Sequence, residues 1–147
     1  FHPPPDNPAL AEWKRKNIEN YLLVPEAWIR TAVRLGNLSE NDMFAQPLIT
    51  TIQDFFTSEN LTLPKGKSWK ELDANVFKVV DGKKILFEDE DSLFQRLRRT
   101  HPSAEVPREA VALAMMPEEI HSDVYTFFDK LKKNVDSLKA AEGQSSA

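Results

Sequence analysis

The positions of the prolines constrain this chain of 147 residues most, because proline is excluded from helix interiors but fits the first helical turn. Four of the first eight residues are prolines, so residues 1–12 are predicted to form an extended connector. Pro25 and Pro117 each precede acidic residues and an apolar pattern, which indicates that helices begin there. Pro47 falls inside another such pattern, so we expect the helix there to kink or to form in two pieces.

Apolar residues recur at helical spacing over most of the chain. The pattern after Pro25 predicts a helix that ends at Gly36, and a second pattern follows Asp42. Shorter helical segments are predicted over 69–72 and 108–116, and a final helix from Pro117. Stripes of this kind normally pack into a core, and that of the final helix comprises Ile120, Val124, Phe127, Phe128, Leu131, Val135 and Leu138.

Two stretches leave β-structure open. Residues 13–23 turn from basic to apolar and end before Pro25, which favours a short extended segment. Residues 76–80 precede the pair Asp81–Gly82, a typical hairpin turn, whereas the favoured alternative is a helix from about Gly82 to Leu97. The fold class is therefore mainly α, with α+β as the alternative. One or two short strands are expected near 13–23, and a strand over 76–80 is left open. Residues 13–141 are expected to form one domain and residues 142–147 a disordered tail.

Composition excludes several classes of protein. The absence of cysteine removes disulfide scaffolds, thiolate metal sites and cysteine nucleophiles. A net charge of −4 argues against a wholly basic nucleic-acid platform, although Arg15 and Lys16 belong to a local basic cluster that is either a solvated face or a set of phosphate contacts. No apolar run approaches the roughly 18 residues of a membrane span, so we expect no membrane partner and a cytoplasmic location. The chain does not begin with Met, and we expect it to be part of a longer protein.

Glu19 and Lys83 are the candidate functional residues. Glu19 is flanked by Ile18, Tyr21 and Leu22, and a carboxylate near such an apolar surface is costly unless it is paired or bound to a metal. Lys83 follows a glycine at a predicted helix start, where its ammonium group could meet a phosphate. The alternatives are a salt-bridged glutamate and an ordinary surface lysine. His2, His101 and His121 lack partners at metal-site spacing and are expected on the surface.

The run Arg15-x-x-Ile18-Glu19-Asn20-Tyr21-Leu22-Leu23-x-Pro25 resembles the C-terminal part of the Toprim region in overcoming-lysogenisation-defect nucleases and related ATPases. The likeness continues in the same order with Asp81-Gly82-Lys83-x-x-Leu86, Pro107-Arg108 and Met116-Pro117-Glu118-Glu119-Ile120, and so covers roughly residues 13–131.

This resemblance implies part of a DNA endonuclease that uses two Mg²⁺ or Mn²⁺ ions and is attached to an ABC-type ATPase. Glu19 would be a catalytic residue and metal ligand, and Lys83 would be catalytic by neutralising charge on the scissile phosphate. Arg15, Lys16 and Lys83 would contact DNA, with Arg15 holding a phosphate or orienting Glu19, while Asn20 and Tyr21 would fix the segment.

The resemblance also implies partners. They are DNA, the upstream ATPase and Toprim core of the same chain, and further copies in a homo-oligomeric parent, while ATP would bind the parent protein. The family's Asp-x-Asp pair is expected upstream of Phe1, because Asp89-x-Asp91 follows the Glu19 run instead of preceding it. This chain alone is thus expected to be inactive. The alternatives are a non-enzymatic helical interaction or dimerisation module, and a regulatory helical cap within an ATPase whose Toprim has lost activity.

Overall fold

The computed structural model describes residues 14–126, and this part of the chain is mainly helical. Its first helices are α1 (Pro25–Leu35) and α2 (Gln46–Ser58), as the apolar spacing predicted. Pro25 opens α1 and the N–H of Gly36 caps its end by donating to the carbonyls of Ala32 and Arg34. No helix within residues 14–126 is both long and apolar enough to cross a membrane.

The second helical pattern forms in two pieces, which was one of the two outcomes expected at Pro47. A 3-10 turn, η3 (Met43–Ala45), is capped by Asp42, whose carboxylate accepts a hydrogen bond from the N–H of Phe44. Pro47 then lies in the first turn of α2, where its missing N–H costs no helical hydrogen bond.

The strand predicted near residues 13–23 is wrong for the described residues, 14–23. Residues 14–17 form bends and η2 (Ile18–Leu22) is a 3-10 helix. The N–H of Asn20 donates to the carbonyl of Asn17 at 3.1 Å, so the run satisfies its backbone locally instead of pairing with a strand.

The strand that the sequence left open over residues 76–80 does not form, because these residues belong mainly to α3 (Asn75–Val79). Phe77 is buried and Val76 and Val80 are partly buried, whereas Val79 is 59% exposed. Burial at positions i, i+1 and i+4 is the pattern of a helix face, since a strand would alternate. No strand occurs anywhere between residues 14 and 126.

The helix predicted from Gly82 to Leu97 is interrupted. It consists of a π-helical turn, η5 (Lys84–Glu88), and α4 (Leu93–Thr100). Between them the chain turns at Asp89, and the Ser92 hydroxyl caps α4 by accepting from the N–H of Gln95. A further 3-10 turn, η4 (Trp69–Glu71), precedes α3.

The last described elements are α5 (Arg108–Ala114) and the 3-10 turn η6 (Pro117–Glu119). Pro117 was predicted to open a long helix, but it opens only η6, and the next helix begins at Ser122. Arg30 of α1 anchors this turn, because its guanidinium donates to the Ala114 carbonyl and pairs with the buried Glu119 carboxylate. The connector 1–12, the tail 142–147 and most of the final predicted helix lie outside the described residues.

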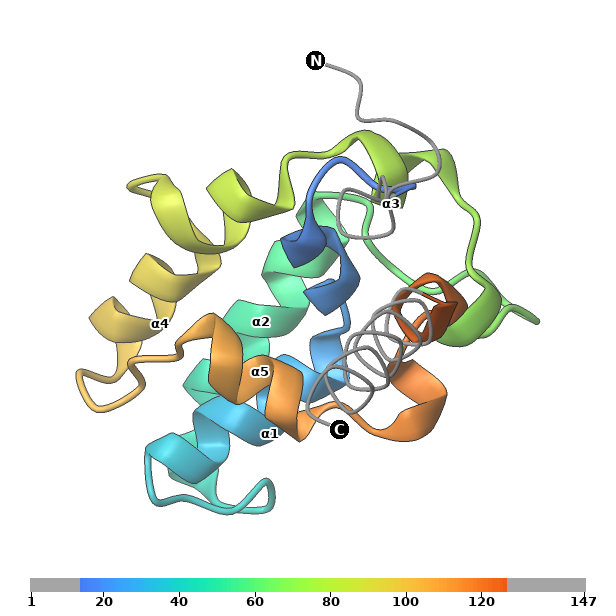
Figure 1. Cartoon of the computed structure of the whole chain (residues 1–147). Helices are drawn as coiled ribbons and strands as arrows, with labels where there is room; N and C mark the ends of the chain where they lie inside the picture. The colour runs from blue at the N-terminus through green and yellow to red at the C-terminus, as the bar shows by residue number, and fades with distance from the viewer. Residues whose placement is uncertain (1–13, 127–147) are drawn as a thin grey trace, which may run out of the picture.

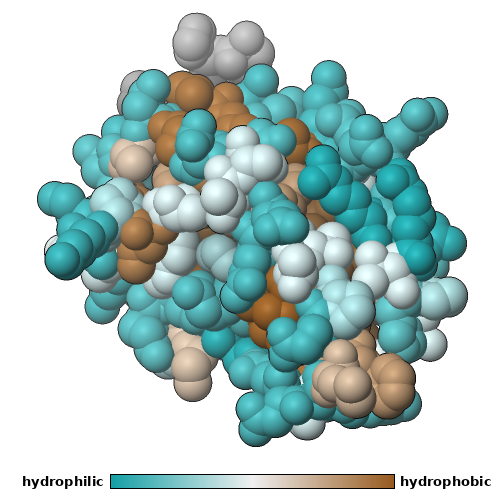
Figure 2. Space-filling model, turned by 180° about the vertical axis from the view of Figure 1, so that it is seen from behind, coloured by the Kyte–Doolittle hydropathy of each residue, from teal (hydrophilic) through white to brown (hydrophobic). Residues whose placement is uncertain are grey.

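Helix α1 is central to the packing. It lies against α2 and α5, and α2 lies against α4, while η2 passes beside α5 (Figure 1). The largest fully buried side chains come from α1, α2, α3, α4, η5 and the loops beside them: Leu23, Trp28, Leu48, Ile52, Phe55, Phe56, Leu61, Phe77, Leu86, Leu93, Leu97 and Val106. Burial of each such side chain stabilises the fold by about 1.5–3 kcal/mol. The face turned away in Figure 1 is mostly hydrophilic, with hydrophobic areas between polar side chains (Figure 2).

Candidate functional site

Arg15 anchors the start of the Glu19 run. Its guanidinium donates to the carbonyl of Asn20 at 2.8 Å and to that of Leu72 at 3.4 Å, and it lies 4.8 Å from the Tyr21 ring centroid. The residue is 6% exposed, and desolvation by burial lowers the pKa of its guanidinium. Arg15 is therefore committed to backbone carbonyls and aromatic rings and does not present its charge to a phosphate in this structure.

Asn20 joins the Glu19 run to the Asp81–Gly82 turn. Its side-chain amide donates to the carbonyls of Phe77 (3.0 Å) and Val80 (2.7 Å), and its oxygen accepts from the N–H of Gly82 at 2.9 Å. A Cβ at position 82 would lie 2.4 Å from that oxygen, so glycine is required for this approach. Asn20 thus fixes the segment, and it brings together two motifs that are 62 residues apart in sequence.

Glu19 is paired with Arg108 of α5. Its side chain is 5% exposed, and the Arg108 guanidinium, 44% exposed, donates to the carboxylate at 2.5 Å. The arginine also lies 5.2 Å from the Phe87 ring centroid. The sequence indicated that a carboxylate here needs a partner but could not identify Arg108, because 89 residues separate the pair and no local spacing links them.

Lys16 and Lys83 both lie at the Asp81–Gly82 turn. The Lys16 ammonium is 3.7 Å from the Asp81 carboxylate, and that carboxylate also accepts from the Asn17 side chain and the Lys84 N–H. The Lys83 ammonium is 3.8 Å from the Glu88 carboxylate. Their side chains are 54% and 48% exposed, so both charges face solvent. The structure therefore brings Lys16 and Lys83 to one turn, while Glu19 and Arg15 are held elsewhere in buried contacts.

Magnesium or manganese would need several carboxylates at one place. Between residues 14 and 126 no three His, Asp or Glu side chains are grouped so that they could hold a metal ion. The Glu19 carboxylate is paired with the Arg108 guanidinium, and a carboxylate–guanidinium pair is not a set of metal ligands. The described residues by themselves do not fit a two-metal centre.

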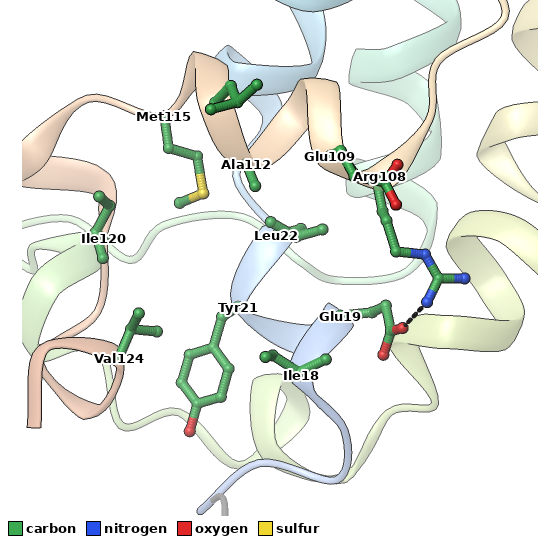
Figure 3. Close-up of a pocket in the computed structure, with 11 residues that line it drawn as sticks. Ile18, Glu19, Tyr21, Leu22, Arg108, Glu109, Ala112, Met115, Ile120 and Val124 are labelled. Carbon is green, nitrogen blue, oxygen red and sulfur yellow. Dashed lines mark hydrogen bonds and ion pairs between the residues drawn. The ribbon is translucent and has the colours of Figure 1, made fainter. Parts of the chain in front are cut away.

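An apolar groove lies beside the Glu19–Arg108 pair. It encloses about 400 Å³ between η2, α5 and residues 115–124. In Figure 3, Met115, Ile120 and Val124 lie across it from Ile18 and Leu22, and the ion pair lies at one end. The complete lining is Ile18, Glu19, Tyr21, Leu22, Arg108, Glu109, Ala112, Leu113, Met115, Ile120 and Val124.

Tyr21 and His121 form a polar network next to this groove. The Tyr21 hydroxyl donates to the Asp123 carboxylate at 2.7 Å, and burial raises the pKa of Tyr21 above its ordinary value. The prediction that His121 lies on the surface is wrong, because its side chain is 12% exposed and its Nε2 is 2.9 Å from the Leu72 carbonyl.

Comparison of the chain with models of protein families, with curated proteins and with solved structures gives no match.

Proposed function

We propose that this chain is the helical C-terminal part of a metal-dependent DNA endonuclease attached to an ABC-type ATPase, and that it supplies phosphate contacts from Lys16 and Lys83. The observation that supports the proposal is the Asp81–Gly82 turn, which gathers both lysines although they lie far apart in sequence. These are the two motifs on which the resemblance depends.

The turn is suited to hold cations in place. Asp81 accepts hydrogen bonds from Asn17 and from the Lys84 N–H, so its carboxylate is fixed where it orients the Lys16 ammonium. Two lysines on a fixed turn offer a backbone phosphate two point charges without sequence preference. With a net charge of −4 on the whole chain, we expect this contact to be local and weak by itself.

The metal ions of the proposed nuclease need carboxylates from outside residues 14–126, because no three acidic or histidine side chains are grouped within those residues and Glu19 is paired with Arg108. The role of Glu19 as a metal ligand remains a prediction. Cleavage is accordingly expected of the intact ATPase–nuclease and not of this chain alone.

DNA binding tests the proposal directly. Fluorescence anisotropy with a labelled duplex should give weaker binding for Lys16→Glu and Lys83→Glu, and a salt dependence shallower by about one for each lost phosphate contact. The matched controls are Lys65→Glu and Lys67→Glu, which change two exposed lysines of the loop before η4 and should have smaller effects. If all four variants lost DNA affinity equally, or if none lost affinity, the assignment of Lys16 and Lys83 as phosphate contacts would be overturned.

The intact ATPase–nuclease tests the activity. It should nick plasmid DNA with Mn²⁺, and Lys83→Ala and Glu19→Ala should each abolish nicking. A circular-dichroism melt separates loss of activity from loss of fold for Glu19→Ala, since that change leaves Arg108 without its partner. Undiminished nicking by both variants would overturn the roles of both residues.

The groove favours a second candidate, a non-enzymatic interaction module. Its apolar lining beside exposed Ile18 and Leu113 is typical of a surface that another polypeptide covers. Absence of DNA binding and of nicking, with groove variants that change association, would favour this candidate over the nuclease.

A further inference from the structure

Lysine side chains gather along residues 14–16 and 78–84, which lie side by side. The N–H of Lys16 donates to the carbonyl of Lys78 at 2.8 Å. Four of the lysines in these two segments are each paired with one carboxylate: Lys14 with Asp123, Lys16 with Asp81, Lys78 with Asp73 and Lys83 with Glu88. The fifth, Lys84, is exposed and forms no ion pair within residues 14–126. One lysine of this surface therefore carries a charge that no carboxylate holds.

The π-helical turn η5 explains why Lys84 lacks a partner. In an α-helix Lys84 and Glu88, four residues apart, would be neighbours on one side and could pair. The N–H of Asp89 donates instead to the Lys84 carbonyl at 2.9 Å, which is a hydrogen bond between residues five apart. The wider turn brings Glu88 to Lys83, five residues before it, with 3.8 Å between the charged groups. Lys84 is left without the acid that an α-helix would have given it.

The backbone of Lys84 is fixed although its side chain is exposed. Its N–H donates to the Asp81 carboxylate at 3.2 Å, and its carbonyl accepts from Asp89. The bond from the Lys84 N–H is the main cause that lowers the pKa of Asp81, and the charges of Lys16 and Lys84 lower it further. Both cations therefore act on the same carboxylate, and the unpaired one is carried on a backbone that cannot easily move.

A phosphate gains different amounts from a paired and from an unpaired lysine. A phosphate that binds Lys83 must replace the Glu88 carboxylate, and one that binds Lys16 must replace Asp81. The gain is then only the difference between two exposed ion pairs. The displaced carboxylate also stays nearby and repels the phosphate. Lys84 makes its contact without such an exchange.

We propose that Lys84 is the principal phosphate contact of the Asp81–Gly82 turn, with the backbone of duplex DNA as its partner. The inference rests on the proposed function and adds to Lys16 and Lys83 the residue that contributes most to binding. The lysine ammonium is a point charge, so the contact is expected to show no preference for DNA sequence.

Fluorescence anisotropy with a labelled duplex, at a series of salt concentrations, tests this order of contributions. Lys84→Gln removes one charge and should weaken binding roughly threefold or more at low salt, with a salt dependence shallower by about one. Lys84→Arg should keep most of the affinity, and Lys83→Gln should lose less than Lys84→Gln. The matched control is Lys65→Gln, because Lys65 is also exposed and without an ion pair in the described part of the chain.

A second measurement needs no substitution. Acetylation of lysines in the full chain, mapped by mass spectrometry, should fall several-fold at Lys84 when the duplex is added, and should not change at Lys65. A Lys84→Gln loss no larger than that of Lys65→Gln, or acetylation of Lys84 that ignores DNA, would remove Lys84 from the contact.

The same assay separates this failure from failure of the proposed function. If Lys16→Glu and Lys83→Glu weaken binding while Lys84→Gln matches Lys65→Gln, only the inference about Lys84 is overturned. If the unmodified chain binds no duplex at low salt, all three phosphate contacts are overturned together.

Discussion

The side-chain oxygen of Asn20 accepts the N–H of Gly82 at 2.9 Å, and a Cβ on Gly82 would lie 2.4 Å from that oxygen. The same side chain donates to the carbonyl of Phe77 in α3 and to that of Val80, the residue that follows α3. One fully buried amide thereby satisfies three backbone groups of a turn and fixes the start of the Lys83 segment.

Gly82→Ala should destabilise the fold by about 1–3 kcal/mol, because the methyl group must displace Asn20 and break a buried hydrogen bond. Urea denaturation measures the change. The control is Gly36→Ala, where the nearest heavy atom would be 3.4 Å from the new Cβ and the effect should be smaller. Equal stability of both variants would show that the Asn20 contact is relaxed in solution.

Arg108→Ala should destabilise the fold by about 2–3 kcal/mol, since it leaves the 5% exposed Glu19 carboxylate without a partner. The value lies below the roughly 3–5 kcal/mol of fully buried pairs because the Arg108 side chain is 44% exposed. Glu19→Gln should cost less, because the arginine that remains can reach water. Thermal melts of the two variants measure the difference.

The control for this pair is Arg98→Ala. Arg98 lies 3.5 Å from Glu105, but both side chains are about half exposed or more, at 45% and 64%. Loss of such a surface pair should cost less than about 1 kcal/mol. An Arg108→Ala loss no larger than this would mean that Glu19 finds water or another donor.

Alkaline pH should weaken the contribution of Tyr21. Burial, and then the hydrogen bond to Asp123, raise the pKa of its hydroxyl, so the folded state keeps this proton to a higher pH than the unfolded state does. The resulting stabilisation is complete below the ordinary tyrosine pKa of about 10 and is lost as the pH rises through the folded value.

Tyr21→Phe removes this dependence. The stability difference between the unmodified chain and Tyr21→Phe, from urea midpoints at a series of pH values above about 9, should shrink as the pH rises. Tyr125→Phe is the control, because Tyr125 is 40% exposed and its hydroxyl bonds the Pro117 carbonyl at 3.3 Å. A constant or growing Tyr21 difference would contradict the assigned direction.

Asp81 should titrate below its ordinary pKa of 3.8. The Lys84 N–H is the main cause, with desolvation opposing it and Asn17 and Lys16 adding smaller contributions. Its stabilising effect is present above about pH 3.8 and is lost as the pH falls through the lowered value. An NMR titration measures the pKa, and Asn17→Ala should raise it. An unchanged pKa in that variant would remove Asn17 from the network.

Local physics explains which elements were predictable. Pro25 and Gly36 bound α1 because a missing N–H and a C-terminal cap act within one helical turn. Pro47 likewise divides η3 from α2. The strand predicted near 13–23 was wrong, and the strand left open over 76–80 did not form. Short apolar runs suit strand or helix equally, so the tertiary contacts of each run decided its conformation. Hydrogen bonds from Asn20 and Arg15 fix residues 14–22 as bends and a 3-10 helix. Burial of Phe77 and Val80 on one side favours a helix over residues 76–80.

By itself, the sequence determined a mainly helical fold, the ends of the best-bounded helices and the need of Glu19 for a partner, because propensity, capping and desolvation act on neighbouring residues. Only the tertiary structure decided that this partner is Arg108 and that Gly82 must be a glycine. It also decided that Lys16 and Lys83 share a turn while Arg15 is buried. Contacts across 62 or 89 residues depend on how the helices pack, and no local spacing encodes them.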